Sequence, residues 1–298
     1  MTALTRRGLI LINAYSALPT ALNQSQRLKE ELAALGIEAD VVKNGAFPFL
    51  TDGNGNIRSQ LAGYDFCVYL DKDKYTSQLL EKLGLRLFNS HSAIRACDDK
   101  AVTHILLSQK NIPMPHTMYG LLCYDPSAPV DKKYLDCVQS ELGYPLIVKE
   151  CYGSLGKGVY KADDRASLEK IAEAVKLKPH IFQKFIAESA GTDIRVMVIG
   201  GKPVAAMRRV SDGDFRSNLE LGGKGEKFDC PAHMADLCAK TAEILGLDYC
   251  GIDVLARNDG YCICEVNSNA FFGGIERVTG VNVARQYARH ICKEIGYK

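Results

Sequence analysis

Apolar and polar residues follow two different periods in the first ninety residues of this chain. An apolar run at 8–14 predicts a β-strand, and apolar residues three or four apart from Leu28 to Leu35 predict a helix that ends at Gly36. The same patterns predict a strand at 64–71, a helix near 77–83 and a strand at 86–90. Because strands and helices alternate, we expect a small parallel sheet in this part of the chain.

Two features separate this pattern from the rest of the chain. The stretch 44–59 is rich in Gly, Pro and Asn and predicts a long loop. A helix is expected to begin with Asp98 or Asp99 as its N-cap, to run to about Gln109 and to end before Pro113. The prolines therefore mark a boundary between domains.

Beyond this boundary the predicted strands follow one another through short turns, and Gly200-Gly201 joins two of them as a tight hairpin. This order indicates a largely antiparallel α+β architecture. The predicted elements are helix 131–142, strands 145–150 and 158–162, helix 166–176, strands 180–186, 193–201 and 202–210, helix 233–246, hairpin 250–267 and helix 282–295. We expect three domains: an N-terminal α/β domain (1–95), a central α+β lobe (96–186) and a C-terminal α+β lobe (187–298).

Composition and charge exclude several classes of protein. The 298 residues include 37 Lys and Arg against 35 Asp and Glu, a net charge of +2, so binding to nucleic acid or to a membrane surface through net charge is not expected. The N-terminal apolar stretch breaks at Asn13, and no later run approaches the roughly 18 residues that cross a membrane. Eleven cysteines without a CxxC pair are typical of reduced thiols, which favours a cytoplasmic protein.

A glycine-rich loop follows a strand that ends in a lysine. Lys149 lies near the end of the strand 145–150, and Gly153-Ser154-Leu155-Gly156-Lys157-Gly158 comes directly after it. Glycines let backbone N–H groups turn toward an anion, and the lysine adds a positive charge, so together they suit a polyphosphate. The glycines join two strands, unlike a Walker A loop or a dinucleotide fingerprint, and a purely structural glycine-rich hairpin is the alternative.

Three oxygen-bearing side chains occur in the hairpin near the C-terminus. A three-residue loop at 258–260 would place Asp253 opposite Glu265, and Asn267 would lie on the same face of the strand as Glu265. Carboxylate and amide oxygens are suitable ligands for Mg²⁺ or Mn²⁺. The alternative is a solvated strand face, but the apolar residues around both carboxylates favour buried strands, where unpaired charges are costly.

A series of arginines lies between these two motifs. Arg195 and Arg209 flank the Gly200-Gly201 hairpin and could face one cavity, and Arg216 and Asn218 follow. Arginine has a rigid fork of donors that fits carboxylate and phosphate groups. Surface charge is the alternative for each arginine, but their proximity to the predicted metal site favours a functional role.

These motifs carry a resemblance to a known family. They occur in the order Asn89-Ser90, Asp99-Lys100, IPMPHT, PLIVKECYGSLGKGV, QKFI, GTDIRVMVIGG, AAMRRV, DFRSNLELGG, GIDV and EVNSNAFFGGIERVTG. In order and spacing they resemble the ATP-grasp ligases, and more narrowly the RimK-type glutamate ligases, which add amino acids to a protein or small-molecule carboxylate. The resemblance covers residues 89–298, whereas residues 1–88 match only in general α/β character. It implies an ATP-grasp fold in which the N-terminal domain precedes two ATP-grasp lobes.

The resemblance also implies roles for individual residues. Asp253, Glu265 and Asn267 would hold two Mg²⁺ ions, with Mn²⁺ as an alternative, and Arg209 and Arg195 would be the catalytic pair. The residues implied for ATP are Lys100, Lys149, Gly153, Ser154 and Gly156 at the phosphates, Gln183, Lys184, Phe185 and Ile186 at the adenine, Asp193 at the ribose, and Arg216 and Asn218 at the phosphates, the metal shell or the acylphosphate oxygens.

The implied activity is an ATP-dependent carboxylate–amine ligase that forms an amide bond through an acylphosphate. Its partners would be an amino acid or another amine and a carboxylate, on a small molecule or at a protein C-terminus. Two alternatives stay open: a synthetase that joins two small metabolites, as in glutathione or D-alanyl-D-alanine synthesis, and a non-catalytic ATP-binding sensor. Relatives commonly form dimers or tetramers, so the resemblance also leaves a homo-oligomer open.

Overall fold

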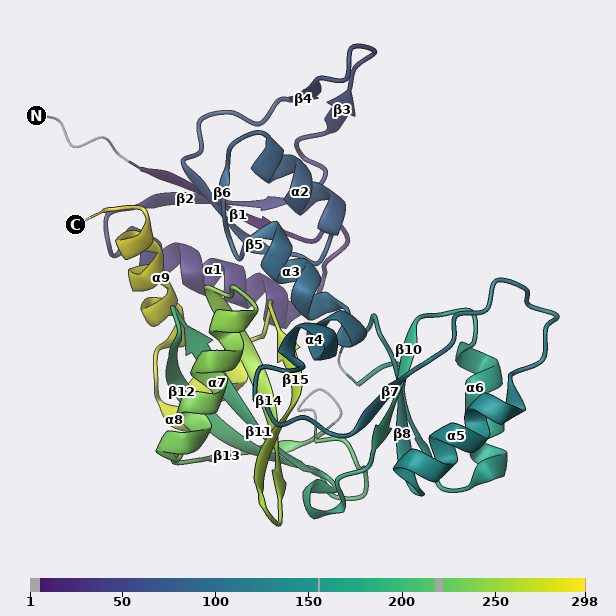
Figure 1. Cartoon of the computed structure of the whole chain (residues 1–298). Coiled ribbons are helices and arrows are strands. Elements are labelled where there is room, and N and C mark those ends of the chain that lie inside the picture. The colour runs from purple at the N-terminus through teal and green to yellow at the C-terminus, as the bar shows by residue number, and fades with distance from the viewer. Residues whose placement is uncertain (1–5, 155, 218–221, 298) are drawn as a thin grey trace, which may run out of the picture.

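The N-terminal part of the chain folds into the predicted parallel sheet. A computed structural model describes residues 6–154, 156–217 and 222–297 (Figure 1). The sheet has the order β2-β1-β5-β6, and every neighbouring pair is parallel. Its strands are β1 (Arg7–Ile12), β2 (Glu38–Lys43), β5 (Phe66–Leu70) and β6 (Arg86–Phe88), and its helices are α1 (Pro19–Ala33), α2 (Lys74–Lys82) and α3 (His91–Asp98).

The segment 44–59 is not the predicted irregular loop. It contains a short antiparallel hairpin of β3 (Phe49–Thr51) and β4 (Ile57–Ser59). Asp52 stabilises the turn, because its Oδ1 accepts hydrogen bonds from the backbone N–H groups of Asn54 and Asn56 at 2.9 Å each. The hairpin extends away from the rest of the molecule (Figure 1).

The central lobe is built on a second sheet, of order β7-β10-β8-β9. Its helices and strands agree with the prediction, except that β7 was not expected and β10 ends at Lys184. The elements are β7 (Thr117–Tyr119), α5 (Lys132–Leu142), β8 (Leu146–Glu150), β9 (Val159–Ala162), α6 (Arg165–Val175) and β10 (His180–Lys184). Leu135, Leu146, Val148, Leu168 and Phe182 form a core that belongs to this lobe alone.

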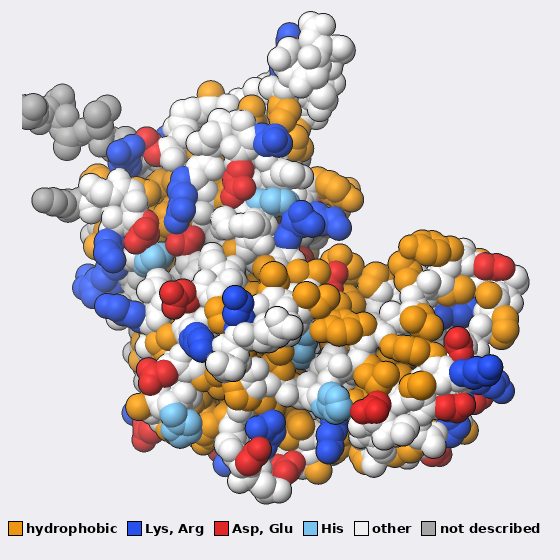
Figure 2. Space-filling view, viewed as in Figure 1, with side chains coloured by type: hydrophobic (Ala, Val, Ile, Leu, Met, Phe, Trp, Pro, Cys, Tyr) orange, Lys and Arg blue, Asp and Glu red, His pale blue; other side chains and the backbone are white. Residues whose placement is uncertain are grey.

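Helix α4 (Lys100–Leu107) leads into the central lobe, and Asp99 caps it, one of the two N-caps expected from the sequence. Its inward face carries the buried Lys100, Thr103, His104 and Leu107, whereas Val102 and Ile105 are exposed. Figure 2 shows apolar side chains on the surface over this helix. Polar residues thus form most of an inward face that an ordinary amphipathic helix fills with apolar residues. Polar contacts, and not only apolar burial, must therefore hold the inward face.

The C-terminal lobe contains a five-stranded antiparallel sheet of order β13-β12-β11-β14-β15. The predicted hairpin at Gly200-Gly201 is confirmed, and both glycines have the positive φ angles, 54° and 73°, that a two-residue turn requires. The elements are the 3-10 helix η1 (Ala187–Ser189), β11 (Thr192–Ile199), β12 (Lys202–Val210), β13 (Lys224–Lys227), α7 (Ala232–Ile244), β14 (Tyr249–Arg257), β15 (Gly260–Asn267), α8 (Gly273–Thr279) and α9 (Val283–Glu294).

The N-terminal sheet and the C-terminal lobe share one hydrophobic core. Ile10, Val68 and Phe88 of the sheet belong to the same buried cluster as Tyr249 and Tyr287 of the lobe, whose rings stack at 4.5 Å. The core of the central lobe is separate from this cluster. Packing therefore joins the first and last parts of the chain, while Leu107 and Ile112, which precede the sheet of the central lobe, lie in a further cluster with the C-terminal sheet.

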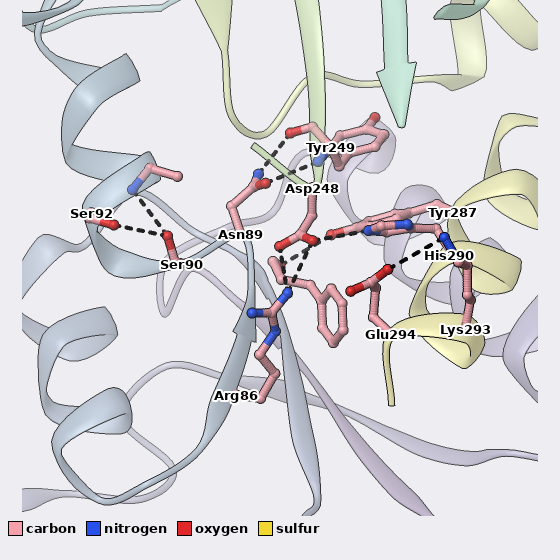
Figure 3. A network of polar contacts seen from close by, with 12 residues as sticks. Arg86, Asn89, Ser90, Ser92, Asp248, Tyr249, Tyr287, His290, Lys293 and Glu294 are labelled. Atoms are coloured by element: carbon pink, nitrogen blue, oxygen red, sulfur yellow. Dashed lines mark hydrogen bonds and ion pairs between the residues drawn. The ribbon is translucent and has the colours of Figure 1, made fainter. Parts of the chain in front are cut away.

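A polar network reinforces this contact (Figure 3). Asp248 accepts hydrogen bonds from Arg86 at 3.1 Å and contacts His290 Nε2 at 3.0 Å. Asn89 Nδ2 donates to the backbone oxygens of Tyr249 and Ser268, at 2.8 and 2.9 Å, and Asn89 Oδ1 accepts from the Tyr249 N–H. Asn89 thus fixes the N-terminal domain to the segment that directly follows Asn267.

Within the described ranges, no helix is both long and apolar enough to cross a membrane.

Candidate active site

The C-terminal hairpin places Asp253 directly across from Glu265, as predicted, although the predicted loop was wrong. The strands β14 and β15 meet through a two-residue turn, because Arg257 pairs with Gly260. The register then shifts between Val254, which pairs with Ile263, and Asp253, so that Cys264 is the extra residue of a β-bulge. The bulge restores the pairing of the two carboxylates that the shorter turn would have moved out of register.

Asp253 is buried and lies between two arginines. Arg195 forms two hydrogen bonds to it, one of them 2.8 Å from Nη2 to Oδ2, and Arg209 Nη2 lies 2.9 Å from Oδ1. Arg209 also binds both oxygens of Asp193, with Nε 2.6 Å from Oδ1. Two arginines and two carboxylates thus form a closed, buried network in which each charge has a partner of opposite sign.

The network has opposite effects on its two carboxyl groups. Burial by itself raises the pKa of Asp253, but the charges of Arg195 and Arg209 outweigh burial and lower it. The pKa of Asp193 is raised, first by burial and then by the charge of Asp253. The pKa of Arg209 is raised above its already high value, because both carboxylates outweigh its burial. Arg209 is therefore the cation that contacts both carboxylates and favours their ionised form.

Two lysines lie near the other carboxylate, and one of them contacts it. Lys100 Nζ lies 3.2 Å from Glu265 Oε1, and Lys149 Nζ lies 3.4 Å from the Sγ atom of Cys264. Burial opposes ionisation of Glu265, but the charges of Lys100 and Lys149 lower its pKa. The charges of Cys264 and Glu265 raise the pKa of Lys149 in spite of its burial. Charged lysines and a charged carboxylate therefore face one another.

A cavity between the central and C-terminal lobes brings together most of the predicted ATP residues. The predicted site residues that line it are Lys100, Lys149, Gly153, Ser154, Gly156, Gln183, Lys184, Phe185, Ile186, Asp193, Arg216, Asp253 and Glu265. Asn218 lies outside the described residues. Arg195, Arg209 and Asn267 line a second cavity instead, and Ser154 and Glu265 line both. The two cavities therefore adjoin at Glu265.

The glycine-rich loop is held over the first cavity at two points. Lys100 Nζ donates to the backbone oxygen of Gly153 at 3.3 Å, and Arg216 Nη1 donates to that of Gly156 at 2.9 Å. Gly156 and Gly158 have positive φ angles, which glycine adopts without strain. Gly153 and Gly156 are thus each held by a cation that also lines the cavity.

The end of β10 forms another wall of the first cavity. Hydrogen bonds to neighbouring residues fix its polar groups in position. The Gln183 side chain donates to Thr117 Oγ1 at 3.0 Å, and the Lys184 N–H donates to the backbone oxygen of His116 at 2.9 Å. Phe185 contacts Phe215 edge to face at 6.5 Å. Phe215 was not predicted to contribute to the site, although it precedes Arg216 in the motif DFRSN.

The buried His104 supports this wall and predicts a pH effect on stability. Gln183 Nε2 lies 3.0 Å from His104 Nε2, so the neutral ring accepts a hydrogen bond there. Burial, and then the charge of Lys149, lowers the pKa of His104 from 6.5 to about 4. The unfolded chain therefore binds this proton more readily between pH 6.5 and 4, and the stability present above this window is lost as pH falls through it.

We expect this histidine alone to lower the free energy of unfolding by about 3 kcal/mol between about pH 7 and pH 4. Urea denaturation gives the free energy of unfolding at each pH in this range. Its slope against pH should be smaller in His104→Gln than in the wild type. The exposed His116 supplies a matched control, because His116→Gln should keep the wild-type slope. An unchanged slope in His104→Gln would contradict the assignment.

The oxygens at the junction of the two cavities fit a hard divalent cation. Among the residues that the structure describes, no group of three or more His, Cys, Asp and Glu side chains is placed to hold a metal ion. The predicted oxygen ligands near this junction are Asp253 and Glu265, which pair across the hairpin, and Asn267, which lines the second cavity. Oxygen donors suit Mg²⁺, and the lysine and arginines that now neutralise the carboxylates would have to share them with the cation.

Comparisons with known proteins find a matching family model and related sequences. Residues 97–291 match the model of the family described as the RimK-like ATP-grasp domain. The chain is 37% identical to N-acetylaspartylglutamate synthase A of Homo sapiens over 219 residues, which are 72% of this chain and 54% of that protein, so it spans about half the length of this relative. It is 34% identical to a probable alpha-L-glutamate ligase of Psychromonas ingrahamii over 277 residues, 89% of each chain.

A solved structure covers nearly the whole molecule. The ATP-grasp ligase PsnB, in complex with a phosphomimetic variant of its minimal precursor, Mg and ADP, superimposes with a TM-score of 0.68 at 21% identity, over 98% of this chain and 99% of that one. The predicted ATP-grasp fold is therefore confirmed, and the likeness includes the N-terminal domain.

Proposed function

The chain belongs to the RimK-like ATP-grasp family, and from this premise we propose that it is an ATP-dependent ligase that joins a carboxylate to an amine. One observation carries the proposal: Lys100 and Lys149 meet Glu265 and Asp253 in a single cavity, with Lys100 3.2 Å from Glu265. Such a set of cations and oxygen ligands suits a nucleotide phosphate chain bound with a metal ion.

Different residues of the site bind different parts of the nucleotide. Lys100 and Lys149 bind the phosphates, with the glycine-rich loop over them. The main chain of 183–186 binds the adenine, and Asp193 accepts a hydrogen bond from the ribose while it holds Arg209 in place. Asp253, Glu265 and Asn267 would hold magnesium, which would supply positive charge beside the phosphates.

The reaction takes place where the two cavities adjoin. An oxygen of the substrate carboxylate attacks the γ-phosphorus of ATP, the bond to the ADP oxygen breaks, and an acylphosphate forms. The amine then attacks the carbonyl carbon, phosphate leaves, and the nitrogen loses a proton to give the amide. Arg209 and Arg195 neutralise charge on the transferred group, and Arg216 stabilises the phosphates. Catalysis by this chain is positioning and charge stabilisation, with no covalent enzyme intermediate.

The second cavity provides the place for the remaining substrates. Its volume is about 880 Å³, within the range of small-molecule sites. We propose an amino acid as the amine, and L-glutamate is the first to test because both relatives carry glutamate in their names. The carboxylate belongs to a small molecule or to a protein C-terminus. Location in the cytoplasm is part of the proposal, and a homo-oligomer stays a prediction.

Release of ADP, measured over a panel of amino acids crossed with a panel of carboxylates, tests the function. We expect release to require one partner from each panel and magnesium, with a product mass equal to the two partners minus one water. Small acids and a peptide ending in a free carboxylate form separate arms, so that a metabolite synthetase is distinguished from a protein-modifying ligase. Nucleotide binding without ADP release in any pairing would favour the sensor and overturn the ligase.

A further inference from the structure

A groove adjoins the second cavity on the side of α2, α3 and α4. Its volume is about 520 Å³, and its walls come from these three helices, the residues just before them and Tyr152 of the central lobe. Lys72 lines both the groove and the second cavity, so the two adjoin at that residue. None of the residues that line the groove lines the first cavity. A substrate that is too long for the second cavity therefore has a further place to bind, apart from the nucleotide.

The wall that α4 contributes is apolar although it faces outward. Val102 and Leu106 are exposed and line the groove, and the exposed Ile105 lies beside them. Because these residues are three and four positions apart, they form one stripe on the helix. The buried face of α4 is the polar one, with Lys100 and His104, so folding of the chain leaves the stripe uncovered (Figure 2). A continuous exposed apolar stripe marks an interaction site.

Two exposed tyrosines also line the groove. Tyr75 belongs to α2, and Tyr152 directly precedes the glycine-rich loop. Lys74 lies over both rings, with Nζ 5.6 Å from the centre of the Tyr75 ring and 5.4 Å from the centre of the Tyr152 ring. These cation–π contacts hold the two rings beside one cation. Tyrosines next to apolar residues are typical of the centre of a protein interface.

The charges that the groove can offer to a partner are positive. Lys74 and Arg95 line it, and neither forms an ion pair with a residue in the described ranges. Each acidic residue that lines the groove already has partners: Asp73 and Asp99 are the N-caps of α2 and α4, and Asp98 pairs with Lys72 at 2.8 Å. The groove therefore favours a partner that carries acidic groups beside apolar side chains.

We propose that this groove docks an acidic and apolar segment of a polypeptide whose C-terminal carboxylate lies in the second cavity. The inference rests on the proposed function and deepens it, because it assigns the carboxylate to a polypeptide and not to a small molecule. The apolar side chains of the segment pack on the stripe of α4 and on the two tyrosines. Its acidic side chains pair with Lys74 and Arg95. The groove holds the polypeptide and takes no part in phosphoryl transfer.

Fluorescence anisotropy with labelled peptides tests the docking, in the presence of magnesium and a non-hydrolysable ATP analogue. The first peptide alternates glutamate with leucine and ends in a free carboxylate. The second has lysine in place of glutamate, and the third is the first peptide with an amidated C-terminus. We expect the acidic peptide to bind at least about tenfold more tightly than the basic one. The amidated peptide should bind more weakly than the free acid, because the second cavity receives the carboxylate.

Substitutions in the groove locate the binding. Leu106→Asp and Arg95→Glu each place a negative charge at an exposed position of the groove, so the acidic peptide should bind at least about tenfold more weakly to either variant. Leu50→Asp on the β3–β4 hairpin and Arg289→Glu on α9 make the same changes at exposed positions outside the groove. Both should keep the wild-type affinity for the peptide, and all four variants should bind the ATP analogue as the wild type does.

The inference is overturned if the acidic peptide binds no more tightly than either of its two control peptides, or if both groove variants keep the wild-type affinity. Sedimentation velocity tests the other occupant of such a face. A wild-type dimer that dissociates in Leu106→Asp would assign the groove to a second copy of the chain and would also overturn the inference. Binding of the ATP analogue is measured in the same samples, so its absence marks failure of the proposed function separately.

Discussion

Glu265→Gln is expected to lower ADP release by at least about a hundredfold, measured with the pair of substrates that the panel identifies. The substitution keeps the shape of the side chain and one oxygen that can accept from Lys100, 3.2 Å away. It removes the negative charge of a carboxylate that lies near two lysines and lines both cavities. Because the neutral amide is a poor ligand for Mg²⁺, the chemical step should fail while the fold remains.

The controls make this loss specific. Circular dichroism should give the same secondary structure for Glu265→Gln and the wild type, and Mn²⁺ titration should show weaker binding in the presence of nucleotide. Glu226→Gln makes the same chemical change at an exposed position of β13 and should leave ADP release within about twofold. Full turnover by Glu265→Gln would remove the metal-binding role from this hairpin.

Arg209→Met should destabilise the protein strongly, because it removes a buried cation that serves two buried anions. Arg209 is 3% exposed and binds both Asp193 and Asp253. Methionine fills much of the same volume but leaves the two carboxylates with less positive charge. Removing one partner from a buried ion pair costs about 3–5 kcal/mol, because the remaining charge is left unpaired. We expect a loss of this size in the free energy of unfolding from urea denaturation at neutral pH.

The loss in free energy of unfolding caused by Arg209→Met should become smaller as pH falls. In Arg209→Met the buried carboxyl groups take up protons more readily, and a neutral carboxyl group needs no counter-charge. The difference from the wild type should therefore shrink as pH falls below about 5. Arg208→Met, the exposed neighbour on β12, is the control and should change stability by less than about 1 kcal/mol. A loss at Arg209 that equals the loss at Arg208, or that is constant with pH, would contradict the charge network.

Hydrophobic periodicity predicted the elements that form the interior of each sheet, and it missed strands at sheet edges. The central strands β8, β11 and β14 carry runs of buried apolar residues. The missed strands β2, β7 and β13 each lie at the end of a sheet and contain sequences such as EADVVK and KGEK. An edge strand has one hydrogen-bonded neighbour and much exposed surface, so its sequence needs few apolar residues.

The candidate site was predictable where its residues lie close together in sequence. Asp253 and Glu265 belong to one hairpin, so the pairing followed from strand geometry even though the turn was wrong. The pairing of Arg195 and Arg209 with Asp253 depends on the order of three strands, which periodicity does not give. Gln24 and Asn269 are 245 residues apart, and only the packing of the N-terminal domain on the C-terminal lobe brings them together. The division into three domains stays a prediction.

The shared core of the first and last parts of the chain determines how nucleotide can enter. The first cavity holds about 120 Å³ of free space, less than the roughly 300–1,000 Å³ usual for ligand sites. The sheet of residues 7–88 and the C-terminal lobe cannot separate without exposing Ile10, Phe88 and Tyr249 to water. The sheet of the central lobe has a core of its own and is free of this restriction, whereas Leu107 and Ile112, ahead of that sheet, are buried against the C-terminal lobe. Entry of ATP is therefore expected to move the sheet of the central lobe, while the N-terminal sheet stays packed on the C-terminal lobe.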